Sequence, residues 1–297
     1  MLSTSCTSKQ NSESTLFNFT QVKGNGKYVT KPVTVGKFKA IELSGSPDLV
    51  FTQRPGVPKV QIYGEENIVP LVDVRTENNI LYISLKHRGS ISYDKLQIKV
   101  SSGILNAATL EGSGSIYING NLKAGNMQMT LKGSGDIHFG NMACASTVLT
   151  LNGSGDISGY NIVCNGFTAV AQGSGSIDIG KLDGDNVSSH LTGSGDISLN
   201  NITASNVSSQ LTGSGDISLK GIAQNAAYMA KGSGDIKAAD MQTENVFAES
   251  KGSGNVYCFA LKTLNARAKG SGEVKYKGAP KLILPESKYE REHIRNM

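Results

Sequence analysis

The chain has 297 residues, of which 35 are Gly, only 7 are Pro and none is Trp, and charged residues make up 18%. A Gly-rich chain with so little Pro is neither collagen-like nor a Pro-driven disordered linker. The formal charge of +5 comes from Lys and Arg spread along the chain rather than gathered in a basic stripe with aromatics, so we expect no nucleic-acid partner. No run of 18 apolar residues is present, and we therefore expect no membrane-spanning helix.

Residues 1–27 form a polar N-terminal segment. It begins MLSTSCTSKQ, with small residues before Cys6 and Ser, Thr, Asn and Gln after it, as at the cleavage site of a bacterial lipoprotein signal peptide. A complete signal needs a basic start and an apolar stretch of about 7 to 15 residues, and only Met1 and Leu2 precede the small residues. Two interpretations stay open: a truncated lipoprotein signal in which Cys6 is lipidated, or a disordered polar tether with an incidental cysteine.

Residues 28–110 are rich in short alternating runs that predict strands, separated by long and irregular loops. These runs occupy residues 33–43, 57–63, 71–75, 80–86 and 96–100. Ser44-Gly45-Ser46, followed by Asp48 and Val50, looks like a degenerate copy of a triplet that recurs later. We interpret the segment as the irregular first coils of a solenoid, and a separate β-domain is the alternative.

Residues 111–280 carry a regular repeat built on the triplet Gly-Ser-Gly. Its successive spacings are 21, 20, 20, 20, 20, 19, 20 and 18 residues, from first glycines at Gly112, Gly133, Gly153, Gly173, Gly193, Gly213, Gly232, Gly252 and Gly270. The fourth residue after the first Gly is always β-branched: Ile116, Ile137, Ile157, Ile177, Ile197, Ile217, Ile236, Val256 and Val274. A mostly apolar position follows two residues later, and a period of two is typical of a strand. Another apolar column is expected at Met142, Ile162, Leu182, Ile202, Ile222, Met241 and Leu261.

Each repeat is too short for a propeller blade, which takes about 40 residues, and it has no helical periodicity. About three short strands per repeat, stacked coil over coil, would enclose a continuous apolar core. The predicted fold is therefore all-β, a parallel β-helix with coils of about 20 residues, Gly at the corners and a ladder of Ser side chains between the glycines. Residues 281–297 are charged and lack the repeat, so we expect a tail or a cap.

The order of these motifs resembles the auto-transporter adhesin family with the head GIN domain, found in surface and periplasmic proteins of Gram-negative bacteria. The likeness covers about residues 30–280: an opening VGKFKAIELSGSPDLVFTQ, a turn from Gly64 to Asn67, a strand pair around ILYISLK, and the GSG-D-I repeats. The resemblance implies a right-handed β-helix in the cell envelope, anchored to the outer membrane, periplasmic or extracellular. The C-terminal PKLILPESKYEREHIRNM departs from the pattern, since a further strand and glycine motif would be expected there.

An acidic residue often follows the triplet, and stacking would bring these carboxylates to within about 5 Å of one another at Asp136, Asp156, Asp196, Asp216 and Asp235. One hypothesis is a metal-binding column. The other is that each Asp caps a corner by bonding to its own backbone, exposed and screened by water, with Ser176 interrupting the run. The spacing of about 20 residues does not match the nonapeptide repeat of calcium-binding β-rolls, so the second hypothesis is favoured and no cofactor is expected.

An enzyme is the less favoured class. Polysaccharide lyases share the β-helix and use an acidic cluster, usually with calcium, and a catalytic Arg or Lys, but the repeats hold a single Arg, Arg267, and no irregular acidic cluster. The four histidines, at 87, 138, 190 and 293, are scattered and select no Ser for a Ser-His-Asp arrangement. Fold analogy alone is a poor warrant for catalysis.

Binding is the favoured class, although the sequence shows no aromatic platform for stacked sugars. Tyr117 and Tyr257 fall on the outward phase of their strands but lie seven repeats apart. We expect a non-enzymatic adhesive or structural rod with a glycan or protein partner at a cell surface and membrane contact only through a lipid anchor. A carbohydrate-active β-helix, lyase-like or lectin, is the alternative.

Cys144 and Cys164 lie eleven residues after Gly133 and Gly153 and so occupy the same position on successive coils. Stacked Cα atoms would lie about 4.8 Å apart, inside the range of about 4.4 to 6.8 Å that a disulfide accepts. The other repeats place there Lys123, Gly184, Ala204, Gln224, Thr243 and Thr263. That variety predicts a tolerant, solvent-facing position where the sulfurs are close, and whether a disulfide forms stays open. Cys258 lies in the apolar column and is expected to be a buried, inert thiol.

Overall fold

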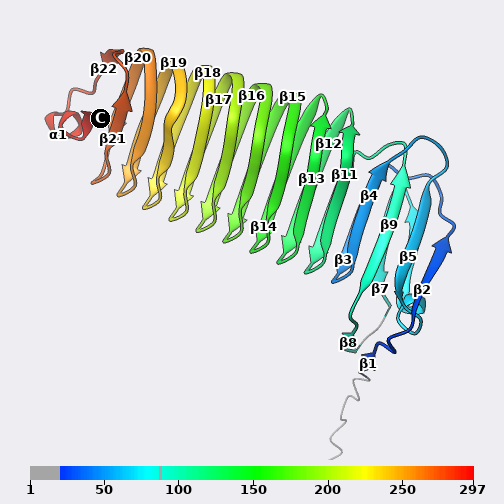
Figure 1. Ribbon diagram of the computed structural model, residues 1–297. Coiled ribbons are helices and arrows are strands. Elements are labelled where there is room, and N and C mark those ends of the chain that lie inside the picture. Colours follow the sequence, from blue (N-terminus) through cyan, green and yellow to red (C-terminus); the bar gives the residue numbers. More distant parts are fainter. Residues whose placement is uncertain (1–20, 87–88) are drawn as a thin grey trace, which may run out of the picture.

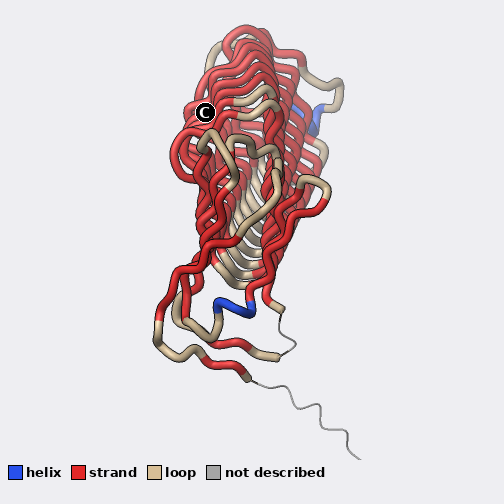
Figure 2. The backbone as a smooth tube through the Cα atoms, turned by 90° about the vertical axis from the view of Figure 1, so that its right-hand side faces the viewer, coloured by secondary structure: helices blue, strands red, loops and turns tan. Residues whose placement is uncertain are grey.

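The structure, a computed structural model, describes residues 21–86 and 89–297. Stacked parallel coils of about 20 residues form a β-solenoid of about 10 turns, which Figure 1 shows from the side. In the perpendicular view of Figure 2 the coils lie one behind another. The solenoid predicted from the repeat is confirmed.

Strands of successive coils pair in parallel and in register. The first regular coil contains β11 (Ser115–Lys123) and β12 (Asn126–Gly133), and the next contains β13 (Asp136–Ala143) and β14 (Ser146–Gly153). Later coils are single bent strands: β15 (Ile157–Gly173), β16 (Ile177–Gly193), β17 (Ile197–Gly213), β18 (Ile217–Gly232), β19 (Ile236–Gly252) and β20 (Val256–Ala268). The three short strands expected in each repeat are merged in these coils because pairing with the neighbouring coil continues through most of each bend.

The Gly-Ser-Gly corner requires its two glycines for different reasons. Gly193 has a φ of +129°, which L side chains rarely adopt, and a Cβ there would also overlap the carbonyl oxygen of Gly173 on the preceding coil. Gly195 lacks a positive φ, but a Cβ there would collide with the carbonyl of Gly175 on the preceding coil. This close approach lets the Gly173 carbonyl accept two hydrogen bonds, from the N–H of Ser194 at 2.9 Å and of Gly195 at 3.0 Å.

The serine of the triplet uses its backbone rather than its side chain to join the coils. In the described part of the chain, the expected ladder of triplet hydroxyls appears only between Ser253 and Ser271, where the oxygens lie 3.2 Å apart. The prediction of a continuous serine ladder was therefore wrong, because the converging N–H groups already hold the corner together.

The core follows the predicted columns except where a coil is short. The β-branched column is fully buried from Ile116 to Val274. Ile222 and Leu261, assigned to the second apolar column, are instead 53% and 48% exposed. The repeat from Gly213 to Gly232 has 19 residues, one fewer than the repeats on either side. Gly221 therefore pairs with Ile202, and Ile222 moves to the outer face. The pairing of β19 with β20 shifts at the same bend, ahead of Leu261.

The N-terminal part combines coils with antiparallel strands. The strands β3 (Ala40–Gly45) and β4 (Asp48–Gln53) pair in parallel with β10 (Ala107–Gly112) and β11, so the coil with the degenerate triplet stacks directly on the regular repeats. On their other side, β7 (Ile80–Leu85) and β9 (Leu96–Ser102) continue the parallel ladders.

Antiparallel strands cover the outer end of this part. They are β2 (Tyr28–Val33), β5 (Lys59–Glu65) and β6 (Val72–Glu77). The strand β2 pairs with β5, β5 pairs with β9, and β6 pairs with β7. A short 3₁₀ turn, η1 (Val69–Leu71), and a small parallel pair, β1 (Val22–Lys23) with β8 (Ile91–Ser92), complete the segment. The antiparallel strands were not predicted.

The charged C-terminal segment folds against the last coils. The strands β21 (Val274–Lys277) and β22 (Lys281–Ile283) both pair in parallel with β20. After the helix α1 (Lys288–Glu292), β23 (Ile294–Asn296) pairs in parallel with β21. The Ser287 hydroxyl caps α1 by accepting the N–H of Glu290. No helix within the described residues has the length and apolarity to span a membrane.

Candidate functional site

The predicted acidic column is a hydrogen-bonded ladder between coils. The Oδ1 atom of Asp196 accepts the N–H of Asp216 at 2.9 Å, and Asp216 accepts that of Asp235 at 2.9 Å. The same bond is repeated by Asp136, Asp156 and Asp235, and Asn255 also makes it, at 3.0 Å. The prediction that each Asp bonds its own backbone was wrong, because coils about 4.8 Å apart bring the next coil's N–H within reach of the short side chain.

The ladder explains how neighbouring carboxylates share one edge of the rod. Each N–H places a partial positive charge beside a carboxylate, and the Lys237 ammonium adds a full one 2.6 Å from Asp216 Oδ2. Burial opposes ionisation of Asp216, but Lys237 and the Asp235 N–H outweigh it and lower its pKa. Among residues 21–86 and 89–297, no three His, Cys, Asp or Glu side chains are grouped as metal ligands.

His138 and His190 lie on different coils, and each contacts a Ser hydroxyl. His138 Nδ1 lies 2.6 Å from the Ser158 hydroxyl, and His190 Nε2 lies 3.0 Å from that of Ser188. No hydrogen bond joins either imidazole to a carboxylate in the part of the chain that the structure describes, and a triad needs that third group to orient its base. His293 contacts the Tyr289 carbonyl at 2.9 Å, and His87 lies outside the described residues.

The two outward tyrosines each contact one neighbouring side chain. Tyr117 stacks on His138 with ring centroids 5.1 Å apart, and the Lys275 ammonium lies 5.5 Å from the Tyr257 ring centroid. Since they lie on distant coils, they contribute to no common surface.

The cysteine column was assigned partly to the wrong residues. Cys164 pairs with Gly184, and the register then runs through Ala204 and Ala223 to Thr243. Three of the predicted residues fall outside this column: Lys123, Gln224 and Thr263. Their repeats have 21, 19 and 18 residues instead of 20, and the difference in length lies before this position.

The true occupants are small, and several are buried. Cys164, Ala223 and Thr243 are 6%, 8% and 0% exposed, so the prediction of a solvent-facing position was wrong. Cys258 is buried as predicted, and burial raises its pKa to about 12, as expected for an inert thiol. Cys6 lies outside the described residues.

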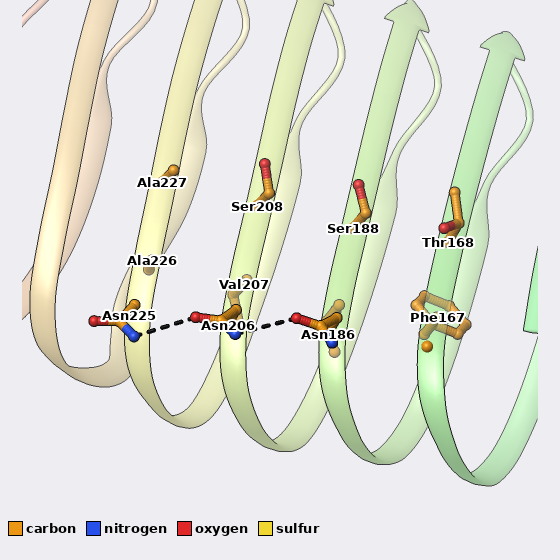
Figure 3. Close-up of a pocket in the computed structure, with 12 residues that line it drawn as sticks. Phe167, Thr168, Asn186, Ser188, Asn206, Val207, Ser208, Asn225, Ala226 and Ala227 are labelled. Atoms are coloured by element: carbon orange, nitrogen blue, oxygen red, sulfur yellow. Dashed lines mark hydrogen bonds between the residues drawn. The ribbon is translucent and has the colours of Figure 1, made fainter. Parts of the chain in front are cut away.

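A ladder of asparagines runs along one corner of the rod (Figure 3). Asn186, Asn206 and Asn225 occupy one position on β16, β17 and β18. The Nδ2 of Asn206 donates to Asn186 Oδ1, and that of Asn225 donates to Asn206 Oδ1, both at 3.1 Å. Asn245 donates to Asn225 at 3.2 Å, and the Thr263 hydroxyl donates to Asn245 at 2.8 Å. Stacked amides form such ladders because each presents a donor and an acceptor along the stacking direction.

Gly166 interrupts this ladder. It pairs with Asn186 on one side and Ser146 on the other, and the ladder resumes where the Ser146 hydroxyl donates to Asn126 at 2.8 Å. A Cβ at residue 166 would meet nothing closer than 4.0 Å, and its φ is not positive, so a side chain would be tolerated. The Asn186 amide nitrogen therefore faces a space one side chain wide.

A shallow groove of about 440 Å³ follows the asparagines across four coils, from Gly166 to Asn225. Its polar lining comes from the asparagine amides and from the hydroxyls of Thr168, Ser188 and Ser208, which Figure 3 shows on the outer face. The side chains of Phe167, Val187, Val207 and Ala226 lie beneath it in the core, where they are 1% to 6% exposed, and no charged residue lines the groove.

The groove was not predicted from the sequence, although the sequence carries a signal for it. An asparagine recurs 12 or 13 residues after the first triplet Gly at Asn186, Asn206, Asn225 and Asn245. Reading that column alongside the acidic one would have identified both the ladder and its interruption at Gly166.

The sequence matches the model of the family described as putative auto-transporter adhesin, head GIN domain, over residues 37–202 and 190–280. The chain belongs to this family. The resemblance drawn from its motifs is thus confirmed, and the description is consistent with an adhesin-like surface protein.

Two solved structures share the fold of this head GIN protein. A protein named as a putative lipid binding protein from Parabacteroides distasonis is 24% identical, with 94% of this chain and 100% of that chain covered and a TM-score of 0.50. A putative adhesin from Parabacteroides merdae is 20% identical, with 93% and 99% covered and a TM-score of 0.50. A search of curated proteins finds no match.

Proposed function

We propose that this chain is a non-enzymatic adhesin-type rod of a bacterial cell envelope and that its asparagine groove binds a neutral, hydroxyl-rich chain such as a glycan strand. The family supports the adhesive class and the surface location. The observation that carries the proposed ligand is the uncharged groove that crosses four coils.

The lining of the groove suits sugar chemistry. Amides and hydroxyls both donate and accept, as sugar hydroxyls do. A charged polymer would find no counter-charge in the groove. Because the polar groups recur at the coil spacing of about 4.8 Å, a repeating ligand could follow them for about 14 Å along the rod.

The gap at Gly166 gives the ladder a donor available to ligand. Within the ladder each amide uses one N–H and its oxygen on neighbouring amides, so Asn206 and Asn225 are largely satisfied along the axis. Asn186 alone among the three faces a glycine on its donor side. A ligand hydroxyl placed over Gly166 would accept from Asn186 and continue the ladder.

In this proposal the polar N-terminal segment tethers the rod to the envelope through Cys6. That arrangement would leave the long polar faces of the coils available to a partner. Cell fractionation of wild-type protein and of a Cys6→Ala variant, expressed behind a complete lipoprotein signal, tests it: the variant should leave the membrane fraction, and an unchanged distribution would contradict the tether.

The test of the groove compares three forms of the protein on a glycan array. Gly166→Asn should complete the asparagine ladder, fill the end of the groove and abolish glycan retention. Gly125→Asn is the matched control: residue 125 also lacks a positive φ, a Cβ there would meet nothing within 4 Å, and it lies two coils before the groove. It should bind as wild type does.

Circular dichroism shows that each variant is folded before it is applied to the array. Retention of the same glycans by Gly166→Asn, or no retention by the wild type, would contradict the proposed ligand. Repeating the array with Ca²⁺ and with a chelator separates the groove from the acidic column, because binding lost in chelator would implicate the aspartates instead.

A further inference from the structure

Two cysteines meet on neighbouring coils at one corner of the rod. Cys144 follows β13, and Cys164 occupies the matching place in β15, where the Val163 carbonyl accepts the Cys144 N–H at 3.0 Å. Both thiols are free, and they occupy matching positions on adjacent coils. Neighbouring parallel strands place matched Cα atoms about 4.8 Å apart, within the range of about 4.4 to 6.8 Å found in disulfides.

The two thiols have different surroundings. Cys164 is 6% exposed, whereas Cys144 is half-buried and has access to solvent. The Cys144 sulfur lies 2.8 Å from the Thr147 hydroxyl. The neighbouring Cys164 thiol and the Thr147 hydroxyl lower the pKa of Cys144, while the Cys144 side chain and burial raise the pKa of Cys164. The accessible sulfur is thus the better nucleophile, since thiolates rather than thiols attack.

The corner leaves room for a reagent and for the sulfurs to join. The next residue in the column is Gly184, which adds no side chain beyond Cys164. An open groove of about 430 Å³, lined in part by Val163, Cys164 and Asp183, adjoins Cys164, while Cys144 itself is half-buried. Among the four cysteines of the sequence, this is the one pair that the described coils bring together, since Cys258 is buried several coils away.

We propose that Cys144 and Cys164 form a peroxide-reactive redox site, in which Cys144 is oxidised first and Cys164 resolves it into a disulfide between coils. The Cys144 thiolate attacks one oxygen of a hydroperoxide, forming an S–O bond and breaking the O–O bond. The leaving oxygen takes up a proton as water or an alcohol, and Cys144 becomes a sulfenic acid. The Cys164 sulfur then attacks the Cys144 sulfur and loses its proton, and the hydroxyl leaves as water. Two thiols are oxidised by two electrons, and one hydroperoxide is reduced.

The experiment uses the full chain with Cys6→Ala, so that Cys258 is the internal reference. The protein is treated with hydrogen peroxide, free thiols are alkylated during unfolding, and peptides are mapped by mass spectrometry. The expected product is a linked peptide pair containing Cys144 and Cys164, with Cys258 still alkylated. Failure to form that pair, or oxidation of Cys144 no faster than of Cys258, would overturn the proposal.

Two variants assign the roles. In Cys164→Ser, a dimedone-type probe should trap the sulfenic acid on Cys144, because no resolving thiol remains; absence of the adduct would refute Cys144 as the attacking residue. In Thr147→Val the hydrogen-bonding hydroxyl is lost from a residue of similar shape, and oxidation of Cys144 at neutral pH should slow several-fold while that of Cys258 is unchanged. An unaltered rate would show that Thr147 does not activate the sulfur. Circular dichroism confirms that each variant is folded.

Discussion

Replacing Gly193 with Ala should destabilise the rod, whereas the same replacement at Gly166 should not. At Gly193 the φ of +129° would hold Ala in a conformation that costs about 1–3 kcal/mol. The new methyl group would also overlap the Gly173 carbonyl of the preceding coil, and overpacking of this kind adds about 1–3 kcal/mol. The expected loss in the free energy of unfolding is therefore about 2–6 kcal/mol.

Gly166 is the matched control because its φ is not positive and its nearest neighbour would be Ser146 Cβ at 4.0 Å. Ala there should be neutral or stabilise by up to about 1 kcal/mol, since it restricts the unfolded chain. Guanidinium unfolding followed by far-UV circular dichroism measures both variants. Slopes are compared as well as midpoints, because coils of a solenoid can unfold separately. Equal midpoints for the two variants would refute the account of the corner.

Two further predictions concern the acidic ladder. The double variant Asp196→Asn with Asp216→Asn keeps both Oδ1 acceptors, as Asn255 does naturally, and should change the free energy of unfolding by less than about 1 kcal/mol. The matched double Ala variant should lose about 1–3 kcal/mol, because two N–H groups lose their partners. Equal losses for the two variants in guanidinium unfolding would show that the ladder bonds contribute nothing. Because the folded-state pKa of Asp216 is lowered, its contribution is present above the unfolded pKa of about 4 and is lost as pH falls through the lower folded value. Thermal unfolding between pH 6 and 3 should therefore show a smaller loss of stability on acidification for Asp216→Asn than for wild type, and parallel curves would contradict the assigned pKa shift.

The regular coils could be predicted because every repeat imposes the same requirements. The close backbone approach at each first glycine, with a positive φ at all of them except Gly270, requires glycine, and the β-branched column must remain inside for the coils to stack. Both features recur about every 20 residues and so appear in the sequence without an alignment. Segment 28–110 offers no such recurrence, and its antiparallel strands depend on partners distant in sequence, such as β5 with β9.

Positions beyond the bends were harder to assign because coil length varies there. Counting forward from the triplet placed Ile222 inside and Gln224 beside the cysteines, yet the missing residue in that coil moves both outward. The same counting succeeded for Cys144 and Cys164 because their repeats have equal length up to that position. Hydrogen bonds between coils were not predictable from local patterns, since the donor and the acceptor are about 20 residues apart.

A regular ladder satisfies its own hydrogen bonds and has little left to offer a ligand. The asparagines of β16 to β19 use their amides on one another, and the aspartates use their carboxylates on the backbone of the next coil. Chemistry becomes available where a column changes its occupant: Gly166 leaves an amide facing open space, and Cys164 beside Cys144 replaces the small inert residues found in other coils. These two changes lie two residues apart in β15. In a rod made of near-identical coils, single departures from the repeat are therefore the places to look for specificity, and β15 carries two of them at one corner.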